Sequence, residues 1–316
     1  MNTSANQAPV PAAELSQIAL VGLGLVGLAL AHRLADAGLR VLGYDVREEA
    51  RITAQAHGVA TAARLQDLRR CEIAVLAVFD TCGVLAVLEG ADGLAMRGSL
   101  RHAIDCSTGD AEALVALAAR LRSAGIGFIE APLSGASAQI EAGEATMLLG
   151  GDEADIVACH AVLAALSPRR VRVGGAGMGA KAKLATNLVL GLNRAVLAEG
   201  MVFAQRLGIA PDRFLQLVLA TPARSDAALA KGEMMVRGEF EPPQSRIRQH
   251  LKDVLLMLAA AQAHGQRLPL SETHAALMQA AIDAGDGDLD NAAIVRQLAR
   301  ETLAAGAMPA AANDEP

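Results

Sequence analysis

The feature that most constrains this chain is a short apolar run followed by three closely spaced glycines, Ile18-Ala-Leu-Val-Gly22-Leu-Gly24-Leu-Val-Gly27. The pattern predicts a strand over 18–21, a tight turn, and a helix over 26–37. Gly22 permits the turn, Gly24 lets a phosphate approach the backbone, and Gly27 lets the helix pack on the strand. The helix N-terminus then offers free N–H groups to an anion. A dinucleotide pyrophosphate is therefore expected here, bound by Gly22, Leu23, Gly24, Leu25, Val26 and Gly27; the alternative is a glycine-rich turn that binds nothing.

An acidic residue follows the next predicted strand, 40–44. Asp45 stands where a carboxylate is expected to accept hydrogen bonds from the adenosine ribose hydroxyls. The same carboxylate would repel a 2′-phosphate, which favours NAD over NADP. Arg47 keeps NADP open, because an arginine there can pair with that phosphate; otherwise it is a solvated surface charge. The predicted cofactor is NAD, with NADP possible.

Further strand patterns alternate with helical ones up to Gly179, and then only helical patterns follow. This order predicts an α/β fold, with an N-terminal Rossmann-type doubly wound sheet and an all-α C-terminal domain joined by a long helix, 180–207. The expected domains are 16–179 and 180–305, with a disordered leader over 1–15 and a disordered tail over 306–316. The further strands are expected at 73–78, 103–105, 127–130, 146–149 and 170–173, and the further helices at 211–219, 225–236, 251–264, 271–284 and 292–304.

Composition narrows the class of protein. The chain has 316 residues, 53% of them hydrophobic but only 2% aromatic, so Ala, Leu, Val and Gly must form the core. A net charge of −6 argues against a nucleic-acid partner. No transmembrane run and no membrane partner are expected, and the longest apolar stretch near the start, 18–31, is too short to span. A soluble, cytoplasmic protein is expected. The cysteines form no CxxC pair, so no metal site is predicted and buried, reduced thiols are expected at Cys71, Cys82, Cys106 and Cys159.

The remaining polar residues limit the chemistry. Tyr44 is the sole tyrosine and no lysine lies four residues after it, so the Tyr–Lys pair of short-chain dehydrogenases is absent. A catalytic histidine stays open. Lys183 and Asn187 share one face at the start of the apolar long helix. Beside an oxidised nicotinamide, burial and a like charge would lower the pKa of Lys183 towards that of a general base. The alternative is a polar pair on an exposed helix face.

Five blocks in order resemble the β-hydroxyacid dehydrogenase family, from about residue 18 to about 298. The first is GLGLVGLALAHRL, residues 22–34, and the second is Asp105-Cys-Ser-Thr108, similar to the family's DxST. The third is Glu130-Ala-Pro-Leu-Ser-Gly-Ala136 with residues 141–151 after it, similar to DAPVSGG and AGTLTIMVGG. The fourth is the Lys183 helix, and the fifth is Lys252-Asp253, similar to the family's KD pair. The helical domain is similar to that of 6-phosphogluconate dehydrogenases.

The resemblance implies roles for particular residues. Lys183 would be the catalytic acid/base and Asn187 would orient the substrate. Ser134, Gly135 and Ala136 would hold the substrate carboxylate, with Asp253 near the site. The residues implied to contact the cofactor are Val78, Phe79, Thr108 and Lys252. Two alternatives stay open: Ser107 and Thr108 as caps of the next helix, and Lys252 and Asp253 as a solvated helix face.

Departures from the family pattern concern the substrate. Ala136 replaces the second glycine of SGG, Val78-Phe79 replaces Leu-Pro, and no proline follows Ser107-Thr108. These changes argue against 3-hydroxyisobutyrate itself. The expected reaction is hydride transfer between nicotinamide and a small β-hydroxy acid or its semialdehyde or keto form, in a homodimer or homotetramer. The alternatives are an imine reductase, which usually carries another residue in place of Lys183, and a non-catalytic NAD(P)-sensing or scaffold protein.

Overall fold

A computed structural model describes residues 17–96 and 98–304 of the chain. Its contacts divide the chain into two compact units, 1–187 and 188–316, and the division falls inside the long helix α8 (Met178–Arg206). The predicted leader, 1–15, and tail, 306–316, lie outside the described residues. The division at 179/180 stays a prediction. Each unit is described by itself below.

The first unit is built on an eight-stranded sheet in the order β2-β1-β3-β4-β5-β7-β6, with β8 paired to β7. The first five strands are parallel, whereas β7 runs antiparallel to β5 and β6 and parallel to β8. The sheet is therefore mostly parallel, as expected, and the α/β class is confirmed. The two-residue strand β6 was not predicted. The strands are β1 Ile18–Val21, β2 Val41–Tyr44, β3 Ile73–Leu76, β4 His102–Asp105, β5 Gly127–Glu130, β6 Leu133–Ser134, β7 Thr146–Gly151 and β8 Arg169–Gly174.

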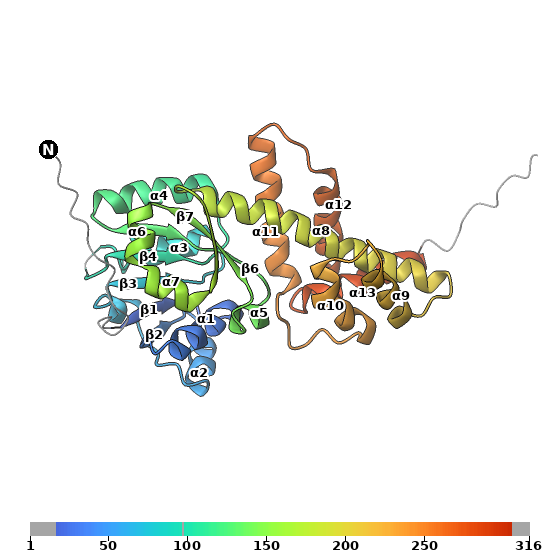
Figure 1. The fold of residues 1–316 in the computed structure, drawn as a ribbon, viewed down its shortest axis with the longest axis horizontal. Helices are drawn as coiled ribbons and strands as arrows, with labels where there is room; N and C mark the ends of the chain where they lie inside the picture. Colours follow the sequence, from blue (N-terminus) through green and yellow to red (C-terminus); the bar gives the residue numbers. More distant parts are fainter. Residues whose placement is uncertain (1–16, 97, 305–316) are drawn as a thin grey trace, which may run out of the picture. The chain divides into compact units, whose positions relative to one another are not determined.

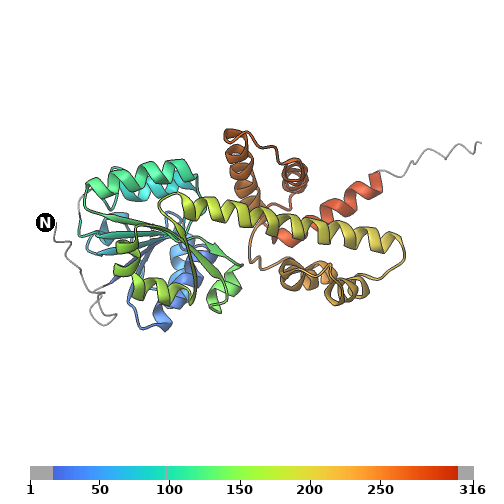
Figure 2. The same cartoon turned by 45° about the horizontal axis from the view of Figure 1, so that its top comes forward.

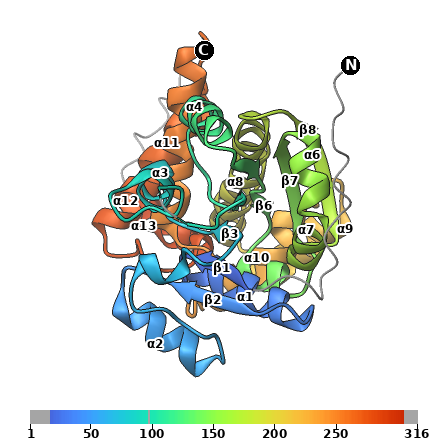
Figure 3. The same cartoon turned by 90° about the vertical axis from the view of Figure 1, so that its left-hand side faces the viewer.

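Helices cover both faces of this sheet (Figures 1 and 3). On one face α1, α2, α5 and α7 contribute buried side chains to a common core, and on the other face α3 and α4 do so. Figure 3 shows α3 and α4 on the opposite side of the sheet from α1 and α7. These helices are α1 Leu25–Asp36, α2 Glu48–Ala56, α3 Thr81–Glu89, α4 Ala111–Ser123, α5 Ser137–Glu141, α6 Glu153–Ala158 and α7 His160–Leu166, with a 3-10 turn at Leu65–Leu68.

Strand β1 consists of apolar residues because both of its faces are buried. Ile18 and Leu20 enter the core under α1, whereas Ala19 and Val21 enter the core under α3 and α4. Successive side chains of a strand point to opposite faces, so a strand covered on both sides needs apolar residues at every position. Small and aliphatic residues fill both cores, as the low aromatic content predicts.

The strand order places the sequence's glycine loop at a defined point. Because β2 and β3 lie on opposite sides of β1, the chain winds in both directions from β1. Ligands of doubly wound sheets bind at the carboxyl ends of the strands, where the direction of winding changes. The segments that follow β1 and β3, which contain Gly22 and Val78, meet at that point.

The second unit is helical. Among residues 188–304 no strand is present, and the pairing is limited to one isolated bridge between Arg246 and Asp290. Ser225 caps α10 through a hydrogen bond from the N–H of Ala228 (3.1 Å), and Gly238 ends it with a φ of 69°. The helical second part is thus confirmed. Its helices are α9 Pro211–Ala220, α10 Asp226–Arg237, α11 Ile247–Ala263, α12 Pro269–Asp283 and α13 Ile294–Ala304, with a 3-10 turn at Asn291–Ala293.

Helix α8 is uninterrupted over its 29 residues (Figure 2). Among the described residues it is the one helix long and apolar enough to cross a membrane, with a mean hydropathy of 1.2. However, 44% of that apolar window is buried inside the protein. It also carries the buried polar residues Lys183, Asn187 and Arg194. These features are those of a core helix of a soluble protein, because ionisable side chains are costly in lipid.

Three of the four cysteines are buried, as predicted, namely Cys71, Cys106 and Cys159. The prediction was wrong for Cys82, which is exposed. Cys82 occupies the first turn of α3, whose buried residues are Val84, Val87 and Leu88, so its side chain falls on the other face of the helix. Burial raises the pKa of the Cys159 thiol to about 12, which keeps that thiol protonated.

Candidate active site

The glycine loop has a backbone that only glycine fits at two positions. Gly22 has a φ of +92°, and a Cβ there would collide with the carbonyl of Ala77 after β3. A Cβ on Gly27 would collide with the carbonyl of Gly22, so the absence of a side chain lets α1 pack against the turn. Both positions match the local reasons given for them from the sequence.

Gly24 differs because the space beside it is open. The nearest atom to a Cβ built there is a guanidinium nitrogen of Arg47, at 3.9 Å. Gly24 is also the N-cap of α1, with no side chain capping that end and no acidic residue in the first turn. An open space over an uncapped, positively polarised helix end suits a dinucleotide pyrophosphate, so the loop fits NAD or NADP.

Asp45 lies beside this loop, directly after β2. Its carboxylate accepts hydrogen bonds from the N–H of Leu23 (2.9 Å) and the N–H of Arg47 (2.9 Å), and it pairs with the Arg47 guanidinium at 3.2 Å. Burial raises the pKa of Asp45, but these bonds outweigh burial and hold the pKa below its ordinary value. The carboxylate is therefore charged at neutral pH and pairs with the exposed Arg47.

The segments that follow β3 and β4 are joined by one hydrogen bond. The Oγ of Ser107 accepts from the N–H of Val78 at 3.0 Å, and the N–H of Ser107 donates to Asp105 (2.9 Å). The predicted cofactor residues Val78 and Thr108 thus lie on two segments that are joined at this edge of the sheet, and Phe79 is half-exposed. Helix α4 is capped by Asp110 through the N–H of Ala113, so neither Ser107 nor Thr108 serves as its cap.

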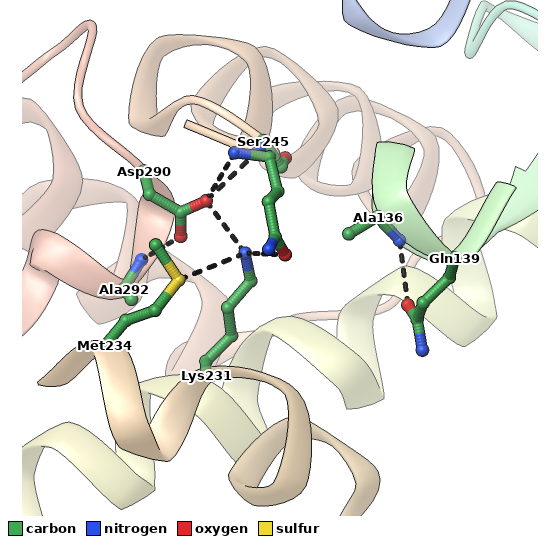
Figure 4. Close-up of polar contacts among 8 residues, drawn as sticks. Ala136, Gln139, Lys231, Met234, Ser245, Asp290 and Ala292 are labelled. Atoms are coloured by element: carbon green, nitrogen blue, oxygen red, sulfur yellow. Dashed lines mark hydrogen bonds and ion pairs between the residues drawn. The ribbon is translucent and has the colours of Figure 1, made fainter. Parts of the chain in front are cut away.

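The predicted substrate loop begins in the edge strand β6. Ser134 pairs with Thr146 of β7, and Gly135 follows with a φ of +152°. The N–H of Ala136, expected to bind a substrate carboxylate, donates to the Oε1 of Gln139 at 2.9 Å (Figure 4). A carboxylate would take this N–H only by displacing Gln139. Gln139 could not be predicted as a partner of Ala136, because the contact depends on the turn that Gly135 allows.

Lys183 and Asn187 lie in the first turns of α8, and both side chains are buried. The Lys183 Nζ donates to the carbonyl oxygen of Leu133 at 2.6 Å and to Asn187 Oδ1 at 2.8 Å. The amine is thus held between β6 and α8, next to Ser134. Their burial excludes the alternative of two polar residues on an exposed helix face.

Glu130 is a second buried polar residue of this region, and no role was predicted for it from the sequence. It ends β5 and is 1% exposed. Its two carboxylate oxygens accept the N–H groups of Gly177 and Ala180, the latter at 2.7 Å, at the start of α8. Burial raises the pKa of Glu130, and the nearby charge of Asp105 adds to the rise. The available sequence signal was an acid at a strand end, three residues before Leu133.

In the second unit, Lys252 and Asp253 lie in α11 and are both largely buried. Lys252 Nζ lies 2.9 Å from Asp253 Oδ1. This burial excludes a solvated helix face for the pair. Their roles toward cofactor and substrate stay predictions.

The second unit also holds a buried ion pair that sequence reasoning missed. Lys231 Nζ lies 2.7 Å from Asp290 Oδ2 (Figure 4). Asp290 also accepts the N–H groups of Gln244 (2.8 Å), Ser245 (3.2 Å) and Ala292 (2.9 Å). It therefore joins α10, the segment at residues 244–245 and the 3-10 turn at Asn291–Ala293. The two residues are 59 positions apart, a separation at which no local pattern indicates a contact.

Fold and loop together define a nicotinamide-dinucleotide-binding protein with a buried lysine on the helix that follows the sheet. Family comparisons agree along almost the whole chain. Residues 17–175 match the model described as the NAD binding domain of 6-phosphogluconate dehydrogenase. Residues 177–298 match the model described as NAD-binding of NADP-dependent 3-hydroxyisobutyrate dehydrogenase. The chain belongs to the β-hydroxyacid dehydrogenase family.

Individual relatives support the same assignment. The chain is 30% identical over 285 residues to an L-threonate dehydrogenase of Cupriavidus necator, covering 88% of this chain and 95% of the relative. It is 29% identical over 286 residues to a 2-hydroxy-3-oxopropionate reductase of Escherichia coli, covering 89% and 97%. The crystal structure of a 3-hydroxyisobutyrate dehydrogenase from Salmonella typhimurium superposes with a TM-score of 0.79 at 27% identity, covering 89% of this chain and 99% of that one. This protein is an NAD(P)-dependent oxidoreductase that acts on a CH–OH group.

Proposed function

We propose that the enzyme transfers hydride between nicotinamide and a small β-hydroxy acid, or its semialdehyde or keto form, with Lys183 as the general acid/base. The observation that carries this proposal is the buried Lys183 amine, which lies 2.6 Å from Leu133 O and 2.8 Å from Asn187 Oδ1. Both of these partners are neutral acceptors. They fix the position of the nitrogen without adding a charge that would hold its proton.

In the oxidation direction the neutral Lys183 Nζ takes the proton of the substrate hydroxyl, while the carbon that bears the hydroxyl loses hydride. A nicotinamide held by the glycine loop would supply the hydride acceptor in oxidation and the hydride donor in reduction. In reduction the Lys183 ammonium gives its proton to the carbonyl oxygen. Asn187 keeps the amine in place through its Oδ1 and orients the substrate with its amide N–H groups.

The substrate carboxylate binds at the loop that follows β6. Ser134 supplies a hydroxyl, Gly135 supplies its backbone N–H, and Ala136 supplies its N–H once the substrate carboxylate displaces Gln139 Oε1 from it, with Asp253 near the reacting end. Ser134 adjoins Leu133, whose carbonyl accepts from the Lys183 amine. A substrate with its carboxylate at Ser134 and its hydroxyl at the Lys183 amine needs only a short carbon chain between the two groups. This suits a β-hydroxy acid. The methyl of Ala136 narrows this turn and argues against 3-hydroxyisobutyrate.

For the cofactor, the loop 22–27 binds the pyrophosphate and Asp45 the adenosine ribose. Arg47 is engaged by Asp45 at 3.2 Å, which supports NAD as the preferred form and leaves NADP possible. Val78, Phe79 and Thr108 border the nicotinamide end, and Lys252 reaches toward it. These roles rest on the family motifs and on the hydrogen bond that joins Val78 to Ser107.

A homodimer or homotetramer in the cytoplasm completes the proposal. Three large apolar side chains of α8 recur every seven residues and are exposed, Val189 (56%), Val196 (69%) and Phe203 (62%), and the exposed Leu207 (62%) directly follows the helix. A stripe at this spacing is typical of a helix that packs against another helix. A second copy of the chain is its proposed cover, and a monomer in sedimentation experiments would reject this.

The test is a panel of hydroxy acids assayed with NAD+ and with NADP+. The panel contains L-threonate, glycerate and 3-hydroxyisobutyrate, with lactate as the α-hydroxy control and a simple alcohol as the control without a carboxylate. We expect turnover on at least one β-hydroxy acid and little on the controls. Cofactor binding without turnover on any member would favour the non-catalytic sensor instead.

A further inference from the structure

The start of α8, which carries Lys183, is held by a side chain from the sheet. Glu130 at the end of β5 accepts the N–H groups of Gly177 and Ala180. The first N–H groups of a helix have no partner within the helix, so a distant carboxylate here replaces the usual local cap. Its negative charge also matches the positive end of the helix dipole.

The backbone around this contact is shaped for close approach. A Cβ on Gly179 would lie 2.7 Å from the Cβ of Glu130, and a Cβ on Gly150 would lie 2.5 Å from the N of Gly179. Both distances are shorter than real Cβ contacts allow. Gly150 is paired with Glu130 across β5 and β7. The two glycines therefore let the first turn of α8 rest directly on the two strands, within reach of the carboxylate.

The same short segment reaches α8 at a second point. Three residues after Glu130, the carbonyl of Leu133 accepts the Lys183 amine at 2.6 Å. Glu130 thus fixes the helix end, and Leu133 contacts the side chain one turn further along. The spacing between Lys183 and the substrate loop at Ser134 depends on both contacts.

We infer that Glu130 is a positioning residue for Lys183: it sets the register of α8 against the substrate loop, and so the place of the amine that exchanges the proton. This inference rests on the proposed role of Lys183. Glu130 itself contacts helix backbone and not the reacting atoms. The chain carries Glu where the family motif DAPVSGG carries Asp.

The first variant to test is Glu130→Gln. One of its two terminal atoms becomes an NH2 group, which cannot accept from an amide N–H, and the charge at the helix end is lost. We expect kcat to fall about tenfold or more, because small misplacements of a catalytic group cost that much. The KM for the dinucleotide should stay within about twofold, since the glycine loop is untouched.

A pH profile separates positioning from a loss of folded protein. In Glu130→Gln the negative charge at the N-terminus of α8 is lost, and the positive end of the helix dipole is no longer offset. Both changes disfavour the ammonium form of Lys183 and lower its pKa, so the acidic limb of kcat/KM should move to lower pH. A smaller fraction of folded enzyme lowers the apparent kcat at every pH equally and moves no limb. Gly179→Ala displaces the helix start while keeping Glu130, and it should lower kcat in the same way.

Asp152→Asn is the matched control, because Asp152 caps α6 of the same unit through the N–H of Ala154 at 3.0 Å. It should leave kcat and the pH profile unchanged.

If Glu130→Gln does not fold, Glu130→Asp is the deciding variant, because it keeps the negative charge and has a shorter side chain. We expect Glu130→Asp to fold with reduced kcat. Wild-type kcat and pH profile in a folded Glu130→Gln or Glu130→Asp would overturn the inference. Lys183→Ala is assayed beside them: if it turns over like the wild type, the proposed function fails, and if it is inactive while the Glu130 variants are normal, only the positioning role fails.

Discussion

The amine of Lys183 lies 2.8 Å from the amide oxygen of Asn187, one turn further along α8. A second acceptor, the carbonyl of Leu133, lies 2.6 Å from the same nitrogen and belongs to the edge strand β6. The amine is thus held by its own helix and by the sheet. The position of the amine is therefore sensitive to both elements.

Asn187→Asp should raise the pH at which the enzyme becomes active in oxidation. A carboxylate at this distance favours the ammonium form of Lys183, which cannot accept the hydroxyl proton. The acidic limb of kcat/KM should move up by about one pH unit, and kcat at neutral pH should fall about tenfold. Asn193→Asp adds the same charge at an exposed position of α8 and is the control. An unchanged pH profile in Asn187→Asp would separate Asn187 from the reacting amine.

Asp45→Asn should weaken NAD more than NADP. The amide cannot accept from both Leu23 and the ribose as the carboxylate can, and it no longer repels a 2′-phosphate or holds Arg47. The ratio of kcat/KM for NAD to that for NADP should fall about tenfold, the effect of one lost charge-assisted hydrogen bond. Glu48→Gln removes an exposed charge nearby and should leave the ratio unchanged. Equal losses for the two cofactors would remove Asp45 from the ribose site.

Asp290→Ala should destabilise the protein more than Lys231→Met. Removing Asp290 leaves the buried Lys231 ammonium unpaired and also orphans the N–H groups of Gln244, Ser245 and Ala292. Breaking a buried pair in this way costs about 3–5 kcal/mol. In Lys231→Met the carboxylate keeps its three N–H donors, so the loss should be smaller. Urea unfolding of the full chain gives both values, and a larger loss for Lys231→Met would contradict this account of Asp290.

His274 should make the protein less stable as the pH falls below neutrality. Burial, with the nearby charge of Arg194, lowers the pKa of His274 to about 4. The unfolded chain, with an ordinary histidine pKa near 6.5, binds a proton first, so stability is lost progressively from about pH 6.5 to about pH 4. His274→Asn should flatten this part of the stability curve, whereas the exposed His160→Asn should not. A variant curve parallel to the wild type between these pH values would exclude His274 as the cause.

Much of the fold could be predicted because its signals are local. Strands β1 and β5 were predicted at their observed bounds, since each has apolar residues at its centre and turn residues nearby. The helix α1 follows from Gly22, Gly24 and Gly27. The strand β6 could not be predicted, because two residues carry no periodicity and Leu133–Ser134 pairs only through β7.

In the candidate site, too, contacts between residues close in the sequence could be predicted, and contacts between distant residues could not. Lys183 and Asn187 are four residues apart on one helix, so their contact follows from helix geometry. Glu130 and Ala180 are 50 residues apart, and Lys231 and Asp290 are 59 apart, so their contacts exist only once the elements have packed. A buried acid at a strand end is equally compatible with many partners. The exposed Cys82 was missed for a related reason, since composition says how cysteines behave on average and not which helix face carries one.

The most direct test of the central claim is turnover by Lys183→Ala, measured together with its NAD binding. Because Lys183 exchanges the substrate proton and the glycine loop binds the dinucleotide, kcat should fall about 10²–10⁴-fold. The Kd for NAD, measured by titration calorimetry on the same folded variant, should stay within about twofold of wild type. Wild-type turnover in a folded Lys183→Ala would contradict the account.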